Sequence, residues 1–284
     1  MRIVAPYELT RTLRLKPSDS GQNLVDFLCM RFPFIPKETW EKRINNGWLR
    51  MNSKPLNSHF VINGRGLISH YSPYVAEPSV PDSVKVIEET RDWLAVYKPA
   101  PMPMHQGGRY YKNTLLYILS EMGYSGVKPV HRLDSVTSGL VLLAKNKQTA
   151  LELTRLFAGN KVRKTYQAIV NGEFPEEPFE VDVPIRRKNG FVFECGHHLA
   201  GAKKAVTRFI LEERGEGISR VKCFPLTGRT HQIRLHLCHA GFPVADDPIY
   251  GMDGDQSGRK LQNSAIMLQS SGIQIDEMGI NLSF

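Results

Sequence analysis

The sequence lacks any long apolar run, and it is poor in cysteine. No stretch of the 284 residues approaches the roughly 18 consecutive apolar residues that a membrane-spanning helix needs, so we expect no membrane association. The N-terminal residues lack the apolar core of a secretion signal. The four cysteines are too scattered to suggest a disulfide framework: Cys29, Cys195, Cys223 and Cys238. These absences favour a cytoplasmic protein in a reducing compartment.

The sequence also lacks the patterns of common cofactor and metal sites. It has no glycine-rich loop of the kind that cradles phosphates, so we expect no nucleotide cofactor. Two clusters contain residue types that bind zinc: Cys195, His197 and His198, and then His236, Cys238 and His239. Neither cluster has the C-x2-C pairing or the cysteine and histidine spacing of a structural zinc site. We therefore expect no metal.

Positive charge is the main compositional feature that the sequence does have. It contains 37 lysines and arginines against 28 aspartates and glutamates, which gives a formal net charge of +9. The isoelectric point of about 9.4 favours a polyanionic partner. Hydrophobic residues make up 41% of the chain, enough for a substantial core. The length suits one large domain, or a large domain with a small appendage.

A cluster of polar residues precedes the most apolar strand that the sequence predicts. The cluster is His131-Arg132-Leu133-Asp134, and the apolar run Leu140–Ala144 follows a short turn. Because the run is short, continuous and bounded by glycine and lysine, it predicts a buried strand with the polar residues in a loop at its mouth. The simplest interpretation is an ion pair that fixes the loop. A second polar segment of similar character, Leu226–His236, favours a functional role for the cluster over an ion pair alone.

Three segments together carry a family resemblance. His131–Lys145 is similar to HRLD-x-x-TSGLLLLAK, Lys164-Thr165-Tyr166 to K-x-Y, and Thr227–His236 to TGR-x-HQIR-x-H. In this order they resemble the RluA-type pseudouridine synthases, and the likeness extends from about Val86 to about Tyr250. Gly241–Gly251 is similar to the family's G-x-P-I-x-G-D-x-x-Y-G, with Asp246 in place of a glycine.

The resemblance implies an activity and a fold. The activity is the isomerisation of specific uridines in structured ribosomal or transfer RNA: the N1 glycosidic bond breaks, the uracil turns, and a bond from C5 forms. In the family the aspartate of the first motif, here Asp134, is essential. It either adds to C1′ of the ribose or removes a proton from C2′, and both routes stay open. The family needs no cofactor. The implied fold is α+β, with a mixed, largely antiparallel sheet and peripheral helices. Our working expectation is a monomer.

Two further residues complete the catalytic set that the resemblance implies. Tyr166 would stack on the extracted base and remove the C5 proton, although a tyrosine in a strand can also simply fill the core. Arg229 would hold the carboxylate of Asp134, a task that suits a guanidinium because it donates two parallel hydrogen bonds.

Other basic residues are expected to contact RNA. Arg132 would fill the stack that the flipped nucleotide vacates, and Arg234 would meet phosphate. Lys164 and Lys98 are expected to contact RNA around the same cleft, and His131 either to support its loop or to contact RNA there. A non-catalytic, basic RNA-binding protein is the alternative. The joint presence of Asp134, Tyr166 and Arg229 favours the enzyme, because a protein that only binds RNA has no need of that set.

Residues 1–75 are expected to form a separate unit. An apolar stripe around Leu24–Leu28 predicts a helix, Lys37–Asn46 a second one, and Trp48–Asn52 a strand. This order resembles the S4 RNA-binding module, though the signature positions of that module are altered here. Three basic residues of the second helix are expected to contact RNA, unless they only form a solvated face: Lys37, Lys42 and Arg43.

Residues 76–284 are expected to form the catalytic domain, after a linker at Ser72–Val84. The predicted strands are Trp93–Tyr97, Leu140–Ala144, Val162–Val170 and Arg220–Phe224, and the predicted helices are Gln148–Phe157 and Thr230–Ala240. Mixed strands with few long helices are typical of an α+β domain.

Overall fold

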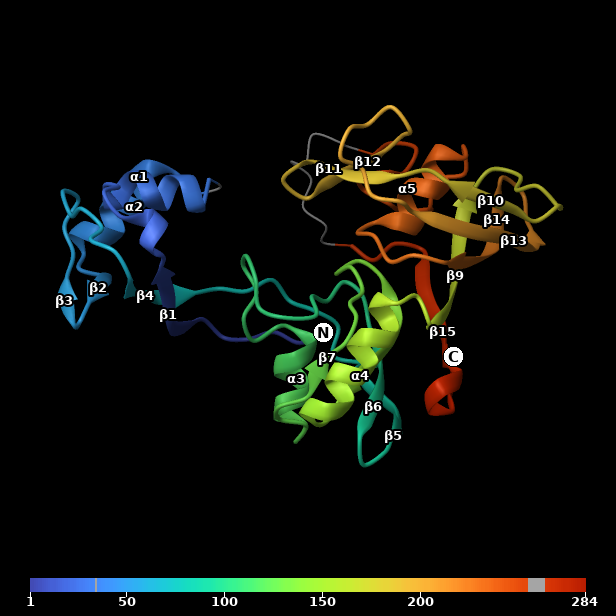
Figure 1. The fold of residues 1–284 in the computed structure, drawn as a ribbon, viewed down its shortest axis with the longest axis horizontal. Coiled ribbons are helices and arrows are strands. Elements are labelled where there is room, and N and C mark those ends of the chain that lie inside the picture. The colour runs from blue at the N-terminus through green and yellow to red at the C-terminus, as the bar shows by residue number, and fades with distance from the viewer. Residues whose placement is uncertain (34, 255–263) are drawn as a thin grey trace. The chain divides into compact units, whose positions relative to one another are not determined.

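The computed structural model describes residues 1–33, 35–254 and 264–284. The chain divides into two compact units, which Figure 1 shows in colours that run along the chain. The smaller unit is Val4–Glu77, and the larger is Pro78–Phe284 together with Met1–Ile3. This division falls near the expected boundary, but it assigns the first three residues to the larger unit.

The attachment of the N-terminus to the larger unit rests on Arg2. Its backbone forms a β-bridge with Val80. The Arg2 guanidinium donates from Nε to Oδ1 of Asn113 at 3.1 Å and pairs through Nη2 with Glu121 at 2.7 Å. A truncation that removes the smaller unit from the N-terminus therefore also removes residues 1–3 and their contacts within the larger unit.

The smaller unit combines a sheet with two helices. In chain order its elements are β1 (Tyr7–Leu15), a short 3-10 turn (Pro17–Asp19), α1 (Leu24–Arg31), α2 (Lys37–Asn45), β2 (Leu49–Met51), β3 (Lys54–Pro55) and β4 (Gly66–Val75). The sheet is antiparallel in the order β1-β4-β2-β3. The predicted helices and strand are present. Because β4 continues to Val75, the first residues of the expected linker belong to a strand.

The larger unit is built on one ten-stranded sheet. Its elements are β5 (Lys85–Glu89), β6 (Trp93–Lys98), α3 (Leu115–Glu121), β7 (Lys128–Pro129), β8 (Ser138–Ala144), α4 (Lys147–Ala158), β9 (Arg163–Asn171), β10 (Phe179–Asp182), β11 (Ile185–Asn189), β12 (Val192–Cys195), β13 (Val206–Arg214), β14 (Ile218–Pro225), α5 (Gln232–His239), β15 (Leu268–Ile275), a 3-10 turn (Asp276–Met278) and β16 (Ile280–Ser283). The main strand order is β10-β13-β14-β9-β15-β8-β6-β5.

The α+β class expected from the sequence is confirmed. Among the strand pairs of the described residues, only β15 and β8 run parallel, and the other pairs are antiparallel. A separate hairpin pairs β11 with β12. Each predicted strand and helix of this unit is present. The helix predicted over Thr230–Ala240 begins later, at Gln232, because His231 adopts a left-handed backbone with φ of +57°.

The apolar run in β8 is explained by cover on both faces of the sheet. Side chains alternate along a strand, so odd and even positions face opposite sides. Leu140 and Leu142 pack in a cluster with residues of α4, whereas Val141 and Leu143 pack in another with residues of α3. A strand covered on both faces reads as a continuous apolar run. This double packing fixes the loop that precedes β8.

Gly139 lies where β8 first meets β15. Its φ is +113°, and its partner in the parallel pairing is Ser270. A Cβ atom built on Gly139 would lie 2.2 Å from the Ser270 carbonyl oxygen. No side chain fits at that distance, so only glycine lets these two strands approach here.

We predict that Gly139→Ala destabilises the fold by about 3 kcal/mol or more, because the clash adds to the backbone strain. Gly126→Ala is the matched control, since Gly126 also has a positive φ, +80°, with nothing within 4 Å of its added Cβ. Left-handed strain alone costs about 1 to 2 kcal/mol. Urea denaturation of both variants measures the difference. Equal losses would contradict a steric role for Gly139.

Candidate active site

Asp134 lies in the loop between β7 and β8, and its side chain is 18% exposed. Its backbone carbonyl accepts a hydrogen bond from the Thr137 amide at 3.2 Å, which forms the tight turn into β8. The carboxylate faces side chains from α5 and from the turn before that helix. Residues a hundred positions apart in the sequence therefore meet at this loop.

Arg234 of α5 is the arginine that contacts Asp134. Its Nη1 donates to Asp134 Oδ2 at 3.3 Å, while Nε and Nη2 bind the two oxygens of Asp247 at 2.6 and 2.8 Å. The Arg234 side chain is 1% exposed and that of Asp247 is fully buried. One guanidinium thus makes a bidentate pair with a structural carboxylate and still reaches Asp134.

Two expectations about arginines were wrong. Arg229 is exposed and donates from Nε to the Lys204 carbonyl at 2.9 Å, and no described contact joins it to Asp134. Arg234 is buried against two carboxylates, so it is not placed to meet phosphate. The cause is the direction of the two side chains. Arg229 lies in the turn before α5 and is exposed, whereas Arg234 lies on the buried face of that helix.

The pKa of Asp134 lies below its ordinary value. Burial by itself favours the neutral acid, but the positive charges of His231, Arg234 and Arg132, with the hydrogen bond from Arg234, outweigh it. Burial lowers the pKa of His231, so this ring is largely uncharged at neutral pH. At neutral pH the two arginines supply the charge beside Asp134, and His231 adds its charge only at the acidic pH at which its ring is protonated.

His231 and Tyr250 form a hydrogen-bonded pair of side chains beside Asp134. Nε2 of His231 lies 3.8 Å from Asp134 Oδ2, and Nδ1 lies 2.9 Å from the Tyr250 hydroxyl. That hydroxyl accepts a hydrogen bond from the Phe193 amide at 2.9 Å. If the hydroxyl donates its own proton to Nδ1, the proton of the neutral ring is on Nε2, facing the carboxylate.

Sequence reasoning assigned no separate role to His231, Asp247 or Tyr250. His231 stood inside the third motif, and the other two belong to the D-x-x-Y of the Gly241–Gly251 segment. The neighbouring Asp246 drew notice instead because it replaces a glycine. It has φ of +60° and is exposed, so it affects the turn rather than the buried pair.

Tyr166 of β9 serves the core and the site together. It packs against two apolar clusters, one that includes residues of α5 and one that includes residues of α3, and forms a hydrogen bond with the Ser270 side chain. Burial raises its pKa far above the ordinary value, and the charge of Asp134 adds to that effect. Tyr166 therefore keeps its proton at neutral pH and lies within the electrostatic reach of Asp134.

Lys98 is buried, which corrects the expectation that it contacts RNA. Lys98 is fully buried and donates to the carbonyls of Pro99, Met102 and Ser135 at 3.2, 2.9 and 3.4 Å. Burial lowers its pKa to about 7. Since Ser135 follows Asp134, Lys98 supports the loop from beneath.

His131 contacts the core through α4 and β8. Its ring stacks on Phe157 with centroids 4.7 Å apart, and Nε2 accepts a hydrogen bond from the Leu142 amide at 2.9 Å. Burial lowers its pKa to about 3, so the ring is neutral. Residue type alone does not indicate this burial.

The other expected RNA contacts remain predictions. Arg132 is exposed beside Asp134, and Lys164 donates to the Thr227 carbonyl at 3.1 Å, with its pKa lowered by burial to about 8. In the smaller unit Lys37 and Lys42 are exposed. Arg43 lies over the Trp40 ring at 4.9 Å.

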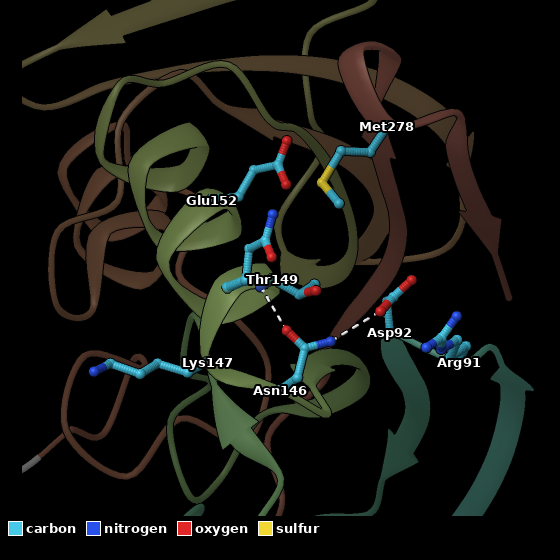
Figure 2. A pocket seen from close by; sticks show the side chains of 8 residues that line it. Arg91, Asp92, Asn146, Lys147, Thr149, Glu152 and Met278 are labelled. Atoms are coloured by element: carbon cyan, nitrogen blue, oxygen red, sulfur yellow. Dashed lines mark hydrogen bonds between the residues drawn. The ribbon is translucent and has the colours of Figure 1, made fainter.

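A pocket of about 750 Å³ lies beside the start of α4, away from these residues. Figure 2 shows that Asn146 is bonded on both sides there: its amide donates to Asp92 at 2.8 Å and its oxygen accepts from the Thr149 amide at 2.9 Å. This is a helix cap whose polar groups satisfy one another. The pocket includes none of the residues expected at the site.

The histidines and cysteines of the sequence do not gather into a metal site in the described part of the chain. Among residues 1–33, 35–254 and 264–284, no group of three or more histidine, cysteine or acidic side chains is arranged to hold a metal. His236 uses both ring nitrogens, toward Thr207 Oγ1 and the Val183 carbonyl, each at 2.9 Å. Over the same residues, no helix is long and apolar enough to cross a membrane.

Comparisons with known proteins agree with the motifs. The mitochondrial tRNA pseudouridine(32) synthase of Saccharomyces cerevisiae is 35% identical over 257 residues, covering 89% of this chain and 55% of that protein. RNA pseudouridine synthase 7 of Oryza sativa is 32% identical over 259 residues, covering 88% and 65%. The chain thus spans between about half and two thirds of these relatives.

Solved structures and a family model give the same result. The structure of human RNA pseudouridylate synthase domain containing 1 matches with a TM-score of 0.61 at 27% identity, covering 73% of this chain and 85% of that one. The family model described as RNA pseudouridylate synthase matches residues 92–239. That range is about half of the chain and contains Asp134, Tyr166 and Arg234, so the chain belongs to the RluA-type family of RNA pseudouridylate synthases.

Proposed function

We propose that this chain converts specific uridines of ribosomal or transfer RNA into pseudouridine. The observation that carries the proposal is the ionised Asp134, held by the buried Arg234 and close to Tyr166. The yeast and rice relatives bear the names of pseudouridine synthases, one of them for transfer RNA. The electropositive composition suits such a substrate.

The reaction conserves all atoms of the uridine. The N1–C1′ bond breaks, the C5–C1′ bond forms, the C5 proton leaves and N1 gains a proton. Asp134 either adds to C1′ to form an ester, or removes the C2′ proton. Its lowered pKa serves both routes, because each needs the carboxylate rather than the acid. Arg234 orients the carboxylate through one oxygen and leaves the other for the ribose.

Tyr166 is suited to hold the base and to receive the C5 proton. Because its pKa is raised, the hydroxyl enters the reaction with its own proton in place. To accept the C5 proton, Tyr166 must therefore pass its own hydroxyl proton to another group in the same step. We assign that transfer to the Ser270 hydroxyl, because it forms a hydrogen bond with Tyr166.

The nucleotide must leave its helix to reach Asp134. Arg132 is exposed next to the loop, and its planar guanidinium can fill the vacated stack. We propose that Val4–Glu77 acts as an RNA-binding unit, since it presents Lys37, Lys42 and Arg43 on one helix. Four free cysteines are compatible with the cytoplasmic location and monomeric state that we propose.

Asp134→Asn should reduce pseudouridine formation by about 1,000-fold or more while RNA affinity changes less than about threefold, because the charge and not the shape is removed. Arg234 keeps its bidentate pair with Asp247, so the fold should persist. Mass-spectrometric mapping of treated RNA and filter binding measure the two effects. An active Asp134→Asn chain would contradict the catalytic role of Asp134. A wild-type chain that binds RNA but forms no pseudouridine would favour the alternative that the protein only binds RNA.

His231→Asn should raise the pKa of Asp134 and move the acidic limb of kcat to higher pH, with about a threefold to tenfold loss of kcat. Asparagine tolerates the left-handed backbone and can replace Nδ1 toward Tyr250, but it presents nothing at the Nε2 position. In the wild type the acidic limb that Asp134 causes should lie below about pH 5, since Asp134 titrates below its ordinary range.

The control for this variant is His239→Asn, which changes an exposed histidine of the same helix. Its pH profile should coincide with that of the wild type. If His231→Asn also leaves the acidic limb in place, then His231 does not act on Asp134.

The double variant Lys37→Ala and Lys42→Ala should weaken RNA binding, with kcat unchanged. The slope of log Kd against log salt should fall by the amount that about two lost phosphate contacts produce. Substitution tests this unit better than truncation, which would also remove Arg2 and its bonds to Asn113 and Glu121. Lys147→Ala with Lys161→Ala is the charge-matched control. Equal salt slopes in the two double variants would refute an RNA-binding role.

A further inference from the structure

The hairpin of β11 and β12 exposes an aromatic side chain at its tip. Phe191 is 79% exposed, whereas the next residue, Val192, is fully buried. The turn has Gly190 at φ of +44°, so the chain reverses tightly and directs the two side chains differently. Packing of the hairpin does not use the Phe191 ring. A large exposed aromatic on a loop tip usually marks a binding surface.

The same hairpin is joined to the candidate active site. The Phe193 amide donates to the Tyr250 hydroxyl, and the Phe193 ring lies 5.2 Å from the ring of His231, which faces Asp134. The Arg187 guanidinium lies over the Phe193 ring, 5.4 Å from its centroid. Figure 1 shows the hairpin beside α5, the helix that carries Arg234. The tip is therefore held at a fixed position relative to the site.

Exposed cations continue from the hairpin across the adjoining segment. Lys203 forms a β-bridge with Ile185 at the base of the hairpin, and the Lys204 carbonyl accepts the hydrogen bond from Arg229. The cationic residues of this surface are Arg187, Lys188, Lys203, Lys204 and Arg229, and all five are exposed. The nearby Glu194 is neutralised by Arg186, whose Nε lies 2.8 Å from its carboxylate.

We propose that this surface, which we call the hairpin surface, binds the RNA strand that flanks the target uridine. Phe191 stacks on an unpaired base, and the five cations contact phosphates. The inference rests on the proposed function, because it takes Asp134 as the point where the uridine is held. In this proposal Arg229 contacts phosphate, whereas Arg234 holds Asp134. An aromatic ring among exposed cations suits single-stranded nucleic acid better than a protein partner.

The first test measures stacking by Phe191. Phe191→Ala should raise the Kd and KM for a modified tRNA or rRNA transcript about tenfold, with the single-turnover rate at saturating RNA unchanged. Transcripts with one abasic residue beside the target should reveal the stacked base: one such residue weakens wild-type binding but not that of Phe191→Ala. Leu151→Ala is the control, since Leu151 is 74% exposed on α4.

The second test measures the cations. Lys203→Ala with Lys204→Ala should lower the slope of log Kd against log salt by about 0.7 for each phosphate that the variant no longer binds. Arg229→Ala should raise KM and leave kcat unchanged. A collapse of kcat in Arg229→Ala would restore its role as the partner of Asp134 and remove it from the hairpin surface.

The outcomes separate the two proposals. If the wild type converts uridine but Phe191→Ala and the lysine variant bind like their controls, the hairpin surface is wrong and the proposed function stands. If the wild type converts no uridine, the proposed function fails, and binding of labelled oligouridine then decides the hairpin surface alone. Equal oligouridine affinity for wild type and Phe191→Ala would overturn it.

Discussion

The site depends on the burial of the Arg234 guanidinium between two carboxylates. A buried cation is tolerated only where its donors are satisfied, and here Asp247 takes two of them and Asp134 a third. Removal of one partner from such a pair usually costs about 3 to 5 kcal/mol, because the remaining charge is left without compensation. Arg234 therefore links the stability of the fold to the ionisation of Asp134.

The strands around this ion pair keep the participants in register. Gly139 allows β8 to approach β15 at Ser270, and Ser270 in turn bonds Tyr166 on β9. Lys98 supports the same loop through three carbonyls. Asp134 and Tyr166 are thus positioned by the centre of the sheet rather than by a loose surface loop.

Much of the fold could be predicted from the sequence, because periodicity and length carry that information. The run Leu140–Ala144 indicated a buried strand, and the α+β class followed from the element order. Site residues were harder to assign. The choice between Arg229 and Arg234 depended on which of them faces the buried interior, and the order of motifs does not reveal that. Lys98 was misread because residue type reveals charge but not burial.

The most direct measurement is the pH titration of the Asp134 carboxyl carbon by nuclear magnetic resonance, assigned by comparison with Asp134→Asn. Our account predicts a pKa below the ordinary value, because the charges of His231, Arg234 and Arg132, with the hydrogen bond from Arg234, outweigh burial. Replacement of Arg234 by methionine should raise that pKa in any variant that folds. An ordinary or raised pKa in the wild type would contradict an aspartate held ionised by a buried arginine.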